Sequence, residues 1–180
     1  RQWGPPFTDS GEAAYFLSVN RNKRSITLNL KSEGGLQILK ELIRHGDVLV
    51  ENFKPGTLAR LGMDYDSLQE IQPGLIYCTV TGYGYTGPYS ERPGYDLMVQ
   101  ALGGFMSITG PSDGEPHRAG VAIADITAGM FSASAVLAAL FSRERTGKGQ
   151  RIDMALLDSQ VAMLSYAASN YLVSGDVPQR

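Results

Sequence analysis

A carboxylate at the end of an apolar run is the strongest chemical candidate in the sequence. Asp125 lies in residues 120–129 (GVAIADITAG), where an apolar stretch ends and a long stretch rich in small residues begins. An aspartate at the start of a helix is most often an N-cap that accepts backbone hydrogen bonds. The helix dipole also favours its ionised form, which is the form that a carboxylate nucleophile requires. The position suits both roles, and the residue types alone favour the cap.

Two further segments carry groups that can hold phosphates. Residues 20–24 (NRNKR) supply the guanidinium and ammonium donors that phosphates need, although charge runs of this kind are most often solvated loops. Residues 51–60 (ENFKPGTLAR) follow an expected strand, and open α/β sheets bind ligands at the carboxyl ends of their strands. An amide, an aromatic ring and two cations there suit an adenine and phosphates, with surface packing as the alternative.

A glycine-rich stretch also follows an expected strand. Residues 82–87 (GYGYTG) match the G-x-G-x-x-G pattern of dinucleotide-binding loops. That interpretation requires a helix to begin at once, so that its N-terminus meets the pyrophosphate. Pro88 and Pro93 prevent this helix. We therefore expect a flexible loop that lines a site, and no NAD site.

The elements that must position these groups follow an α/β pattern. Residues 25–30 alternate polar and apolar side chains, which predicts a half-buried strand. Ser32 can cap a helix that ends at His45, and residues 47–51 then predict a second strand. Strand, helix and strand in this order predict a right-handed parallel βαβ unit, which the strand at residues 75–80 extends. The fold class is therefore α/β, with a Rossmann-like open parallel sheet flanked by helices.

The remaining elements alternate in the same way. We expect short helices at 57–61 and 66–71, helices at 95–103, 125–143 and 156–173, and a strand at 151–154. The 125–143 segment is rich in Ala, Ser and Leu, which suits a helix packed closely against a sheet.

Composition excludes several classes of protein. The chain has 180 residues, 43% hydrophobic and 19% charged, with a formal net charge of −2. This balance suits one soluble domain and does not indicate a surface for nucleic acid or membrane, and no apolar run is expected to span a membrane. Cys78 is the single cysteine, so the sequence predicts neither disulfides nor a cysteine zinc site.

Several stretches in a fixed order resemble the family III CoA-transferases, the group that includes formyl-CoA transferase and carnitine CoA-transferase. Within that family, the closest likeness is to the succinate–hydroxymethylglutarate (glutaryl) CoA-transferases, through residues 77–87 and 108–111. The stretches that carry the family resemblance are residues 18–25 (SVNRNKRS), 50–56 (VENFKPG), 82–88 (GYGYTGP), 94–96 (GYD), 124–129 (ADITAG) and 146–153 (TGKGQRID).

The resemblance implies a mechanism and a set of site residues. Asp125 corresponds to a nucleophilic aspartate that forms aspartyl anhydride and aspartyl-CoA thioester intermediates, and Tyr95 to an active-site tyrosine. The implied substrates are an acyl-CoA and a carboxylic acid, such as the dicarboxylates succinate or glutarate, with no permanently bound cofactor and no metal. The implied contacts to CoA are Asn20, Lys23, Asn52, Phe53, Arg60 and Arg92.

The resemblance also implies an architecture. Residues 1–180 correspond to a single fragment of the large, Rossmann-like domain, and we expect the family's N-terminal start, small domain and C-terminal part to lie outside it. The full-length family forms interlocked homodimers, and the expected compartment is the cytoplasm or the mitochondrial matrix. We expect an enzyme in the full-length protein. A CoA-binding fragment without turnover of its own remains an alternative for this segment.

A racemase is the alternative within the family. The α-methylacyl-CoA racemases pair an aspartate with a histidine, which stands where this chain has Tyr95. Neither His45 nor His117 can replace that histidine by sequence position. Because the reference pKa of tyrosine is about 10, a neutral tyrosine is a poor proton acceptor near pH 7. CoA transfer is therefore favoured over proton transfer.

Overall fold

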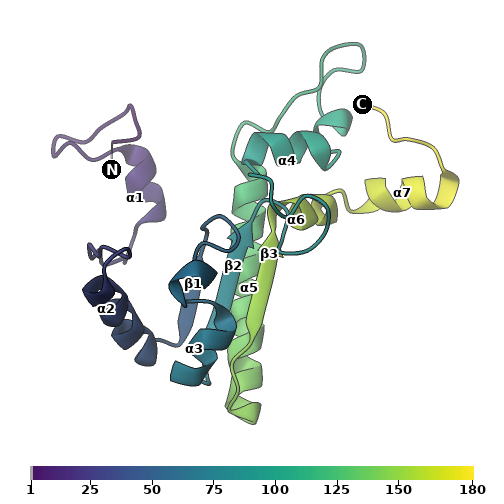
Figure 1. The fold of residues 1–180 in the computed structure, drawn as a ribbon. Helices are drawn as coiled ribbons and strands as arrows, with labels where there is room; N and C mark the ends of the chain where they lie inside the picture. The colour runs from purple at the N-terminus through teal and green to yellow at the C-terminus, as the bar shows by residue number, and fades with distance from the viewer. Residues whose placement is uncertain (1) are drawn as a thin grey trace.

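A three-stranded parallel sheet forms the centre of the molecule, as a computed structural model of the chain that describes residues 2–180 shows (Figure 1). The strands are β1 (Val48–Glu51), β2 (Ile76–Thr81) and β3 (Arg151–Ala155), in the order β1-β2-β3. Both pairings are parallel, so the carboxyl ends of all three strands lie at one edge of the sheet. The predicted α/β class and its parallel sheet are confirmed.

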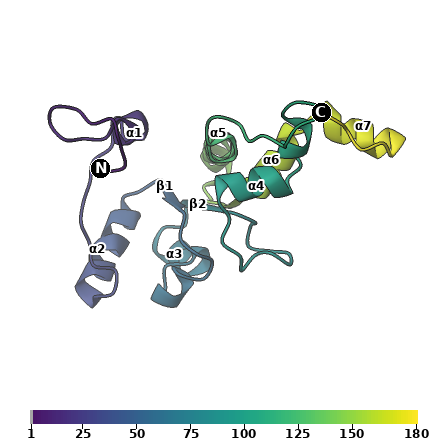
Figure 2. The same ribbon diagram turned by 90° about the horizontal axis from the view of Figure 1, so that it is seen from above.

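Helices cover both faces of this sheet. The view from above separates α2 and α3 on one side of the strands from α5 on the other (Figure 2). The helices are α1 (Ala14–Val19), α2 (Glu33–Arg44), α3 (Tyr65–Ile71), α4 (Asp96–Leu102), α5 (Ile123–Thr146), α6 (Leu156–Met163) and α7 (Tyr166–Ser174), with 3-10 turns η1 (Ala59–Leu61) and η2 (Met106–Ile108).

Two apolar cores form, one on each face, and β2 contributes to both. Tyr77 packs with Ile43 and Leu68, from α2 and α3. Val80 points to the opposite face, where it packs with a second cluster that includes Val99 of α4 and Ala128 of α5. Successive side chains of a strand point to opposite faces. Because both faces of β2 are covered, almost every residue along the strand is buried.

The first expected strand is absent. Residues 25–30 are extended but pair with no strand in the part of the chain described here. Leu28 and Leu30 are partly buried and face the same groove as Leu39 and Leu49, whereas Ile26 remains exposed. The alternation therefore reflects one apolar face against that groove. The prediction of a βαβ unit that begins at this segment is wrong, although its helix, capped by Ser32 as expected, and its second strand are present.

Two further features of the helices differ from expectation. The single helix expected over 156–173 is broken into α6 and α7, because Ser165 adopts a positive φ of 48° that an α-helix cannot accommodate. The short helix α1 lies in a region for which no helix was expected.

The longest helix, α5, is more apolar than the composition suggested. Its most apolar 18-residue window has a mean hydropathy of 1.7, so α5 is long and apolar enough to cross a membrane, contrary to expectation. One such helix is weak evidence for a membrane span, because the core helix of a soluble protein passes the same test. Ala124, Ala128 and Ala139 are buried, whereas Met130 and Leu137 are exposed.

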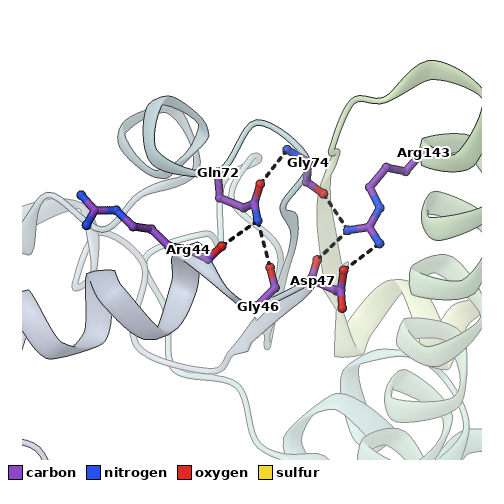
Figure 3. A network of polar contacts seen from close by, with 6 residues as sticks. All are labelled: Arg44, Gly46, Asp47, Gln72, Gly74 and Arg143. Carbon is purple, nitrogen blue, oxygen red and sulfur yellow. Dashed lines mark hydrogen bonds and ion pairs between the residues drawn. The ribbon is translucent and has the colours of Figure 1, made fainter.

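Polar contacts fix the C-terminal part of α5 at the amino edge of the sheet (Figure 3). Arg143 donates from Nη2 to Oδ1 of Asp47 at 2.9 Å and from Nη1 to the carbonyl oxygen of Gly74 at 3.0 Å. Gln72 donates from Nε2 to the carbonyl oxygen of Arg44 at 3.1 Å. These contacts join the segments before β1 and β2 to α5, so this edge is closed and the opposite edge carries the open loops.

Candidate functional site

A cavity of about 200 Å³ lies where β1 and β2 end. Residues 52–55 after β1, residues 81–82 at the end of β2 and residues 91–95 line it. The lining includes four of the predicted site residues, namely Asn52, Phe53, Arg92 and Tyr95. Residues from two segments about 40 positions apart therefore meet at the carboxyl edge of the sheet, where α/β proteins bind ligands.

A contact between two glycines brings these segments together. A Cβ atom built on Gly94 would lie 2.4 Å from Cα of Gly82, and one on Gly82 would lie 2.4 Å from Cα of Gly94. The two backbones therefore touch, and no other residue type fits at either position without a shift. This contact places Tyr95 beside the end of β2.

The glycine- and tyrosine-rich loop is anchored at its centre. The backbone amide of Tyr85 donates to Oδ2 of Asp153 at 2.9 Å, and its hydroxyl donates to Oε1 of Glu51 at 3.3 Å. The guanidinium of Arg151 lies 4.3 Å from the centre of the Tyr85 ring. Burial, followed by the negative charge of Glu51, raises the pKa of Tyr85, so this hydroxyl remains a hydrogen-bond donor. We expected a flexible loop, and the structure instead shows one held by three side chains.

The cavity presents both cations and apolar surface. Arg92 lies over the ring of Tyr89, with Cζ 4.1 Å from the ring centre, and Lys54 is exposed. The Phe53 ring is about half exposed. Asn52 donates from Nδ2 to the carbonyl oxygen of Val80 at 2.5 Å, which fixes the loop after β1 to β2. Glu91 adds one carboxylate to the lining, so the cations exceed the anions by one. Two cations and an exposed ring suit an anionic ligand with an aromatic group.

Three predicted contacts lie outside this lining. Asn20 donates to the carbonyl oxygen of Phe16 at 2.9 Å, and Lys23 donates to that of Val19 at 2.5 Å. Their segment lies beside α1, to one side of the sheet (Figure 1). Arg60 belongs to the same loop region as the cavity, but its guanidinium contacts Thr57 at 3.4 Å. The structure therefore does not bring the two predicted phosphate-binding segments together.

Asp125 does not cap its helix. It is the third residue of α5, and the N-cap is Ala122, which has no capping side chain. Oδ1 of Asp96, the first residue of α4, accepts from the amides of Ala124 at 2.8 Å and Asp125 at 3.4 Å. The prediction that Asp125 is the cap is wrong, because a carboxylate from another helix occupies that role. Within residues 2–180, no hydrogen bond to the Asp125 carboxylate is found.

The environment of Asp125 disfavours its charged form. Partial desolvation by the surrounding protein, followed by the negative charge of Asp96, raises the pKa of the Asp125 carboxyl. The helix dipole alone was expected to stabilise the anion. The direction is opposite because desolvation, followed by the negative charge of Asp96, disfavours the anion. Asp125 is therefore a carboxyl that is accessible to solvent, without a hydrogen-bond donor and next to a second carboxylate.

The two histidines belong to segments other than α5. His45 ends α2, before β1 begins, and its ring contacts Glu41 at 3.3 Å. His117 lies in a turn where its backbone amide bonds to Thr109. Among the described residues, no group of three or more His, Cys, Asp or Glu side chains could hold a metal ion.

With this geometry established, comparison with known proteins decides the family. The model of CoA-transferase family III matches residues 1–180. The chain belongs to this family. The succinate–glutarate CoA-transferase of Agrobacterium fabrum is 52% identical over 185 aligned residues, which cover 100% of this chain and 46% of that protein. The succinyl-CoA:glutarate CoA-transferase of Mus musculus is 53% identical over 173 residues, covering 96% of this chain and 39% of that protein.

A crystal structure supports the same assignment for this family III chain. A CAIB/BAIF family protein from Brucella suis matches it with a TM-score of 0.97 and 52% sequence identity, covering 100% of this chain and 48% of that one. The chain thus spans less than half the length of each of these three relatives. The resemblance stated from the sequence is confirmed at the level of the family.

Sequence reasoning missed the residues that support the site. Asp96 and Gln100 of α4, and Glu51 and Asp153 at the sheet, hold the loops and the helix start around the cavity. Asp96 directly follows Tyr95, so its place in the stretch 94–96 was the available signal. Its partner segment lies 28 residues later, and no sequence pattern connects the two.

Proposed function

We propose that the full-length protein transfers coenzyme A between an acyl-CoA and a carboxylic acid, with Asp125 as the nucleophile. The observation that carries the proposal is the state of this carboxyl: it is accessible, accepts no hydrogen bond within residues 2–180, and lies on the helix whose start is bonded to the residue after Tyr95. A carboxylate without donors is a better nucleophile than one whose lone pairs are engaged. Family membership supports this chemistry.

The reaction would proceed through four exchanges at carbonyl carbons. An oxygen of the Asp125 carboxylate attacks the thioester carbon, the C–S bond breaks, and CoA thiolate leaves an aspartyl–acyl anhydride. The thiolate then attacks the Asp125 carbonyl carbon and releases the donor acid, which leaves an aspartyl-CoA thioester. The acceptor carboxylate displaces the thiolate to form a second anhydride. The thiolate finally attacks the acceptor's carbonyl carbon, which gives the new acyl-CoA and regenerates the Asp125 carboxylate without net proton transfer.

The cavity would bind part of the CoA molecule. Its volume of about 200 Å³ is smaller than the ~300–1,000 Å³ typical of complete ligand sites. Lys54 and Arg92 supply charge for a phosphate, and the exposed Phe53 ring offers a stacking surface for the adenine. Asn52 positions the loop between them. In this proposal Tyr95 borders the space between the cavity and Asp125, where the thioester reacts.

The names of the relatives support dicarboxylates as the acids. Two are named for succinate or succinyl-CoA together with glutarate, and a relative from Acetobacter aceti is named acetyl-CoA:oxalate CoA-transferase. We assign the same substrate class to this protein, with no permanently bound cofactor. We also propose a homodimer, with residues 1–180 forming the large-domain part of each subunit, and analytical ultracentrifugation of the full-length protein tests that stoichiometry.

The decisive experiment traps the covalent intermediate. Full-length protein is incubated with succinyl-CoA and glutarate, then treated with hydroxylamine and analysed by peptide mass spectrometry. We expect hydroxamate at Asp125 and no transfer by Asp125→Ala. Asp158→Ala, which removes an exposed carboxylate from α6, is the matched control and should remain active. Full transfer by Asp125→Ala would refute the mechanism.

A second measurement separates transfer from proton exchange. A racemase would incorporate solvent deuterium at the α-carbon of a 2-methylacyl-CoA, whereas the proposed transferase would not. Tyr95 supports transfer because its phenol is a poor base near pH 7. Incorporation of deuterium at a rate comparable to turnover would overturn the assignment.

A further inference from the structure

Asp96 joins two helices through hydrogen bonds from both. Its Oδ1 accepts from the amides of Ala124 at 2.8 Å and Asp125 at 3.4 Å, at the start of α5. Its Oδ2 accepts from Nε2 of Gln100 at 2.6 Å, one turn later in α4. The first amides of an α-helix have no partner within the helix. Asp96 therefore provides a hydrogen-bond acceptor for the first amides of α5, which no side chain of α5 itself provides.

Gln100 extends this connection to the segment that enters α5. It is completely buried, and its Oε1 accepts from the amide of Ala119 at 2.8 Å. Side chains of α4 thus hold both Ala119, in the segment that precedes α5, and Ala124, in the first turn of α5. A completely buried amide with both functional groups bonded to fixed partners has little freedom to move. The direction in which the chain enters α5 is consequently set by α4.

We infer that Asp96 is a positioning residue for Asp125, supported by Gln100, and that it holds the first turn of α5 so that the nucleophilic carboxylate faces the cavity. This inference rests on the proposed function of Asp125. Tyr95 and Asp96 are adjacent, and Gly94 is fixed against Gly82 at the end of β2. The same short segment therefore lines the cavity through Tyr95 and accepts from the backbone amide of Asp125 through Asp96.

The hydrogen bonds to Asp96 also explain why the Asp125 carboxylate accepts no hydrogen bond within residues 2–180. Because Asp96 occupies the amides of Ala124 and Asp125, these donors are not available to the Asp125 side chain. Four elements pack against α5: α4 contributes the carboxylate of Asp96, α6 that of Asp158, and β3 that of Asp153 together with the guanidinium of Arg151, whereas β2 contains no carboxylate or cation. Desolvation raises the pKa of Asp125, and the negative charge of Asp96 raises it further.

Two substitutions at Asp96 separate its bonding from its charge. Asp96→Asn keeps one oxygen that can accept from both α5 amides, but it removes the charge and the acceptor of Gln100 Nε2, whereas Asp96→Ala removes all of these. In the full-length protein we expect kcat to fall by roughly 100-fold in Asp96→Ala, since a displacement of about 1 Å at a reacting group costs that much. Asp96→Asn should lose less than roughly tenfold, and KM for succinyl-CoA should be unchanged in both variants.

The pH profile provides a measurement that a purely structural role would not change. The acid limb of kcat/KM reports the pKa of the free enzyme's essential base. Because Asp96→Asn removes a negative neighbour, this limb should move to lower pH, and Asp158→Asn should leave it in place. Since Asp96→Asn retains the bonds to α5, the profile remains measurable even if Asp96→Ala fails to fold.

Each result bears on one hypothesis. An unmoved acid limb in Asp96→Asn, equal losses of kcat in both Asp96 variants, or a loss confined to KM would overturn the positioning role. Full activity of Asp125→Ala would instead refute the proposed nucleophile. An inactive Asp125→Ala combined with a fully active Asp96→Ala would refute the positioning role and leave the proposed function intact.

Discussion

The contact between Gly82 and Gly94 predicts a large response to a single methyl group. In Gly94→Ala the new Cβ would lie 2.4 Å from Cα of Gly82, whereas ordinary contact begins at 3.4 Å. The two segments must separate by about 1 Å to restore ordinary contact. Both contacting atoms belong to the backbone, so no side chain can rotate away. The segment that carries Tyr95 and Asp96 must move instead.

Two costs follow from this displacement. Overpacking at a close contact costs about 1–3 kcal/mol of the free energy of unfolding, and a shift of ~1 Å at a reacting group costs roughly 100-fold in rate. We expect both effects in full-length Gly94→Ala, measured by urea unfolding and by the rate of CoA transfer from succinyl-CoA. The φ angle of Gly94 is not in the left-handed region, so strain of the alanine backbone does not contribute.

A matched variant and a double variant sharpen this prediction. Gly34→Ala, in α2 with no atom within 4 Å of the new Cβ, should retain activity and gain about 0.5–1 kcal/mol of stability from its helical position. Gly82→Ala and Gly94→Ala open the same gap, so the double variant should cost less than the sum of the single ones. Unchanged unfolding and turnover in Gly94→Ala would refute the backbone contact.

Three further predictions concern α5 and the cavity. Arg143→Ala should lower the free energy of unfolding by about 1–2 kcal/mol, measured by urea unfolding, and leave KM for acyl-CoA unchanged. The loss of stability is small because Asp47 is mostly exposed, so its ion pair with Arg143 contributes little. Arg92→Ala should raise KM for acyl-CoA roughly tenfold in a steady-state assay, because one charge-assisted hydrogen bond is lost. Arg145→Ala is the control, since Arg145 lies at the far end of α5, and it should leave KM unchanged. The raised pKa of Asp125 means that its ionisation destabilises the folded state. Asp125→Asn should therefore be more stable than the wild type at pH 7, measured by urea unfolding. This difference in stability should vanish as the pH falls below 3.8, the ordinary pKa of an aspartate. Equal stability at pH 7 would contradict the raised pKa.

The sequence predicted the parts of the fold that depend on local pattern. The strands β1, β2 and β3 and the helix α5 were expected within a few residues of their observed bounds, because each is a strongly apolar or periodic segment. The break at Ser165 was not predictable, since no glycine or proline interrupts residues 156–173. Alternation over residues 25–30 indicated an apolar face, but it could not show whether a partner strand lies beside it.

Part of the cavity lining was predictable from residue types, whereas the hydrogen bonds that connect its segments were not. Asn52, Phe53, Arg92 and Tyr95 were expected at a ligand site, and they line one cavity. Residue types alone favoured Asp125 as the cap of α5, because sequence rules for caps consider only neighbouring residues. The observed acceptor is the carboxylate of a residue 29 positions earlier, a connection that depends on how α4 packs against α5.

The hydrogen bonds that join α4 to the segment entering α5 have a consequence for protein engineering. The excursion between α4 and α5 leaves directly from the end of α4, and its far end is anchored because Gln100 and Asp96 accept from the amides of Ala119 and Ala124. Its exposed tip at residues 113–114 is therefore mechanically isolated from the start of α5. Because lengthening a surface loop costs little free energy, an epitope tag or a fluorophore-binding peptide inserted there would report on the protein without altering its chemistry. Natural variation in the length of this loop would be tolerated for the same reason.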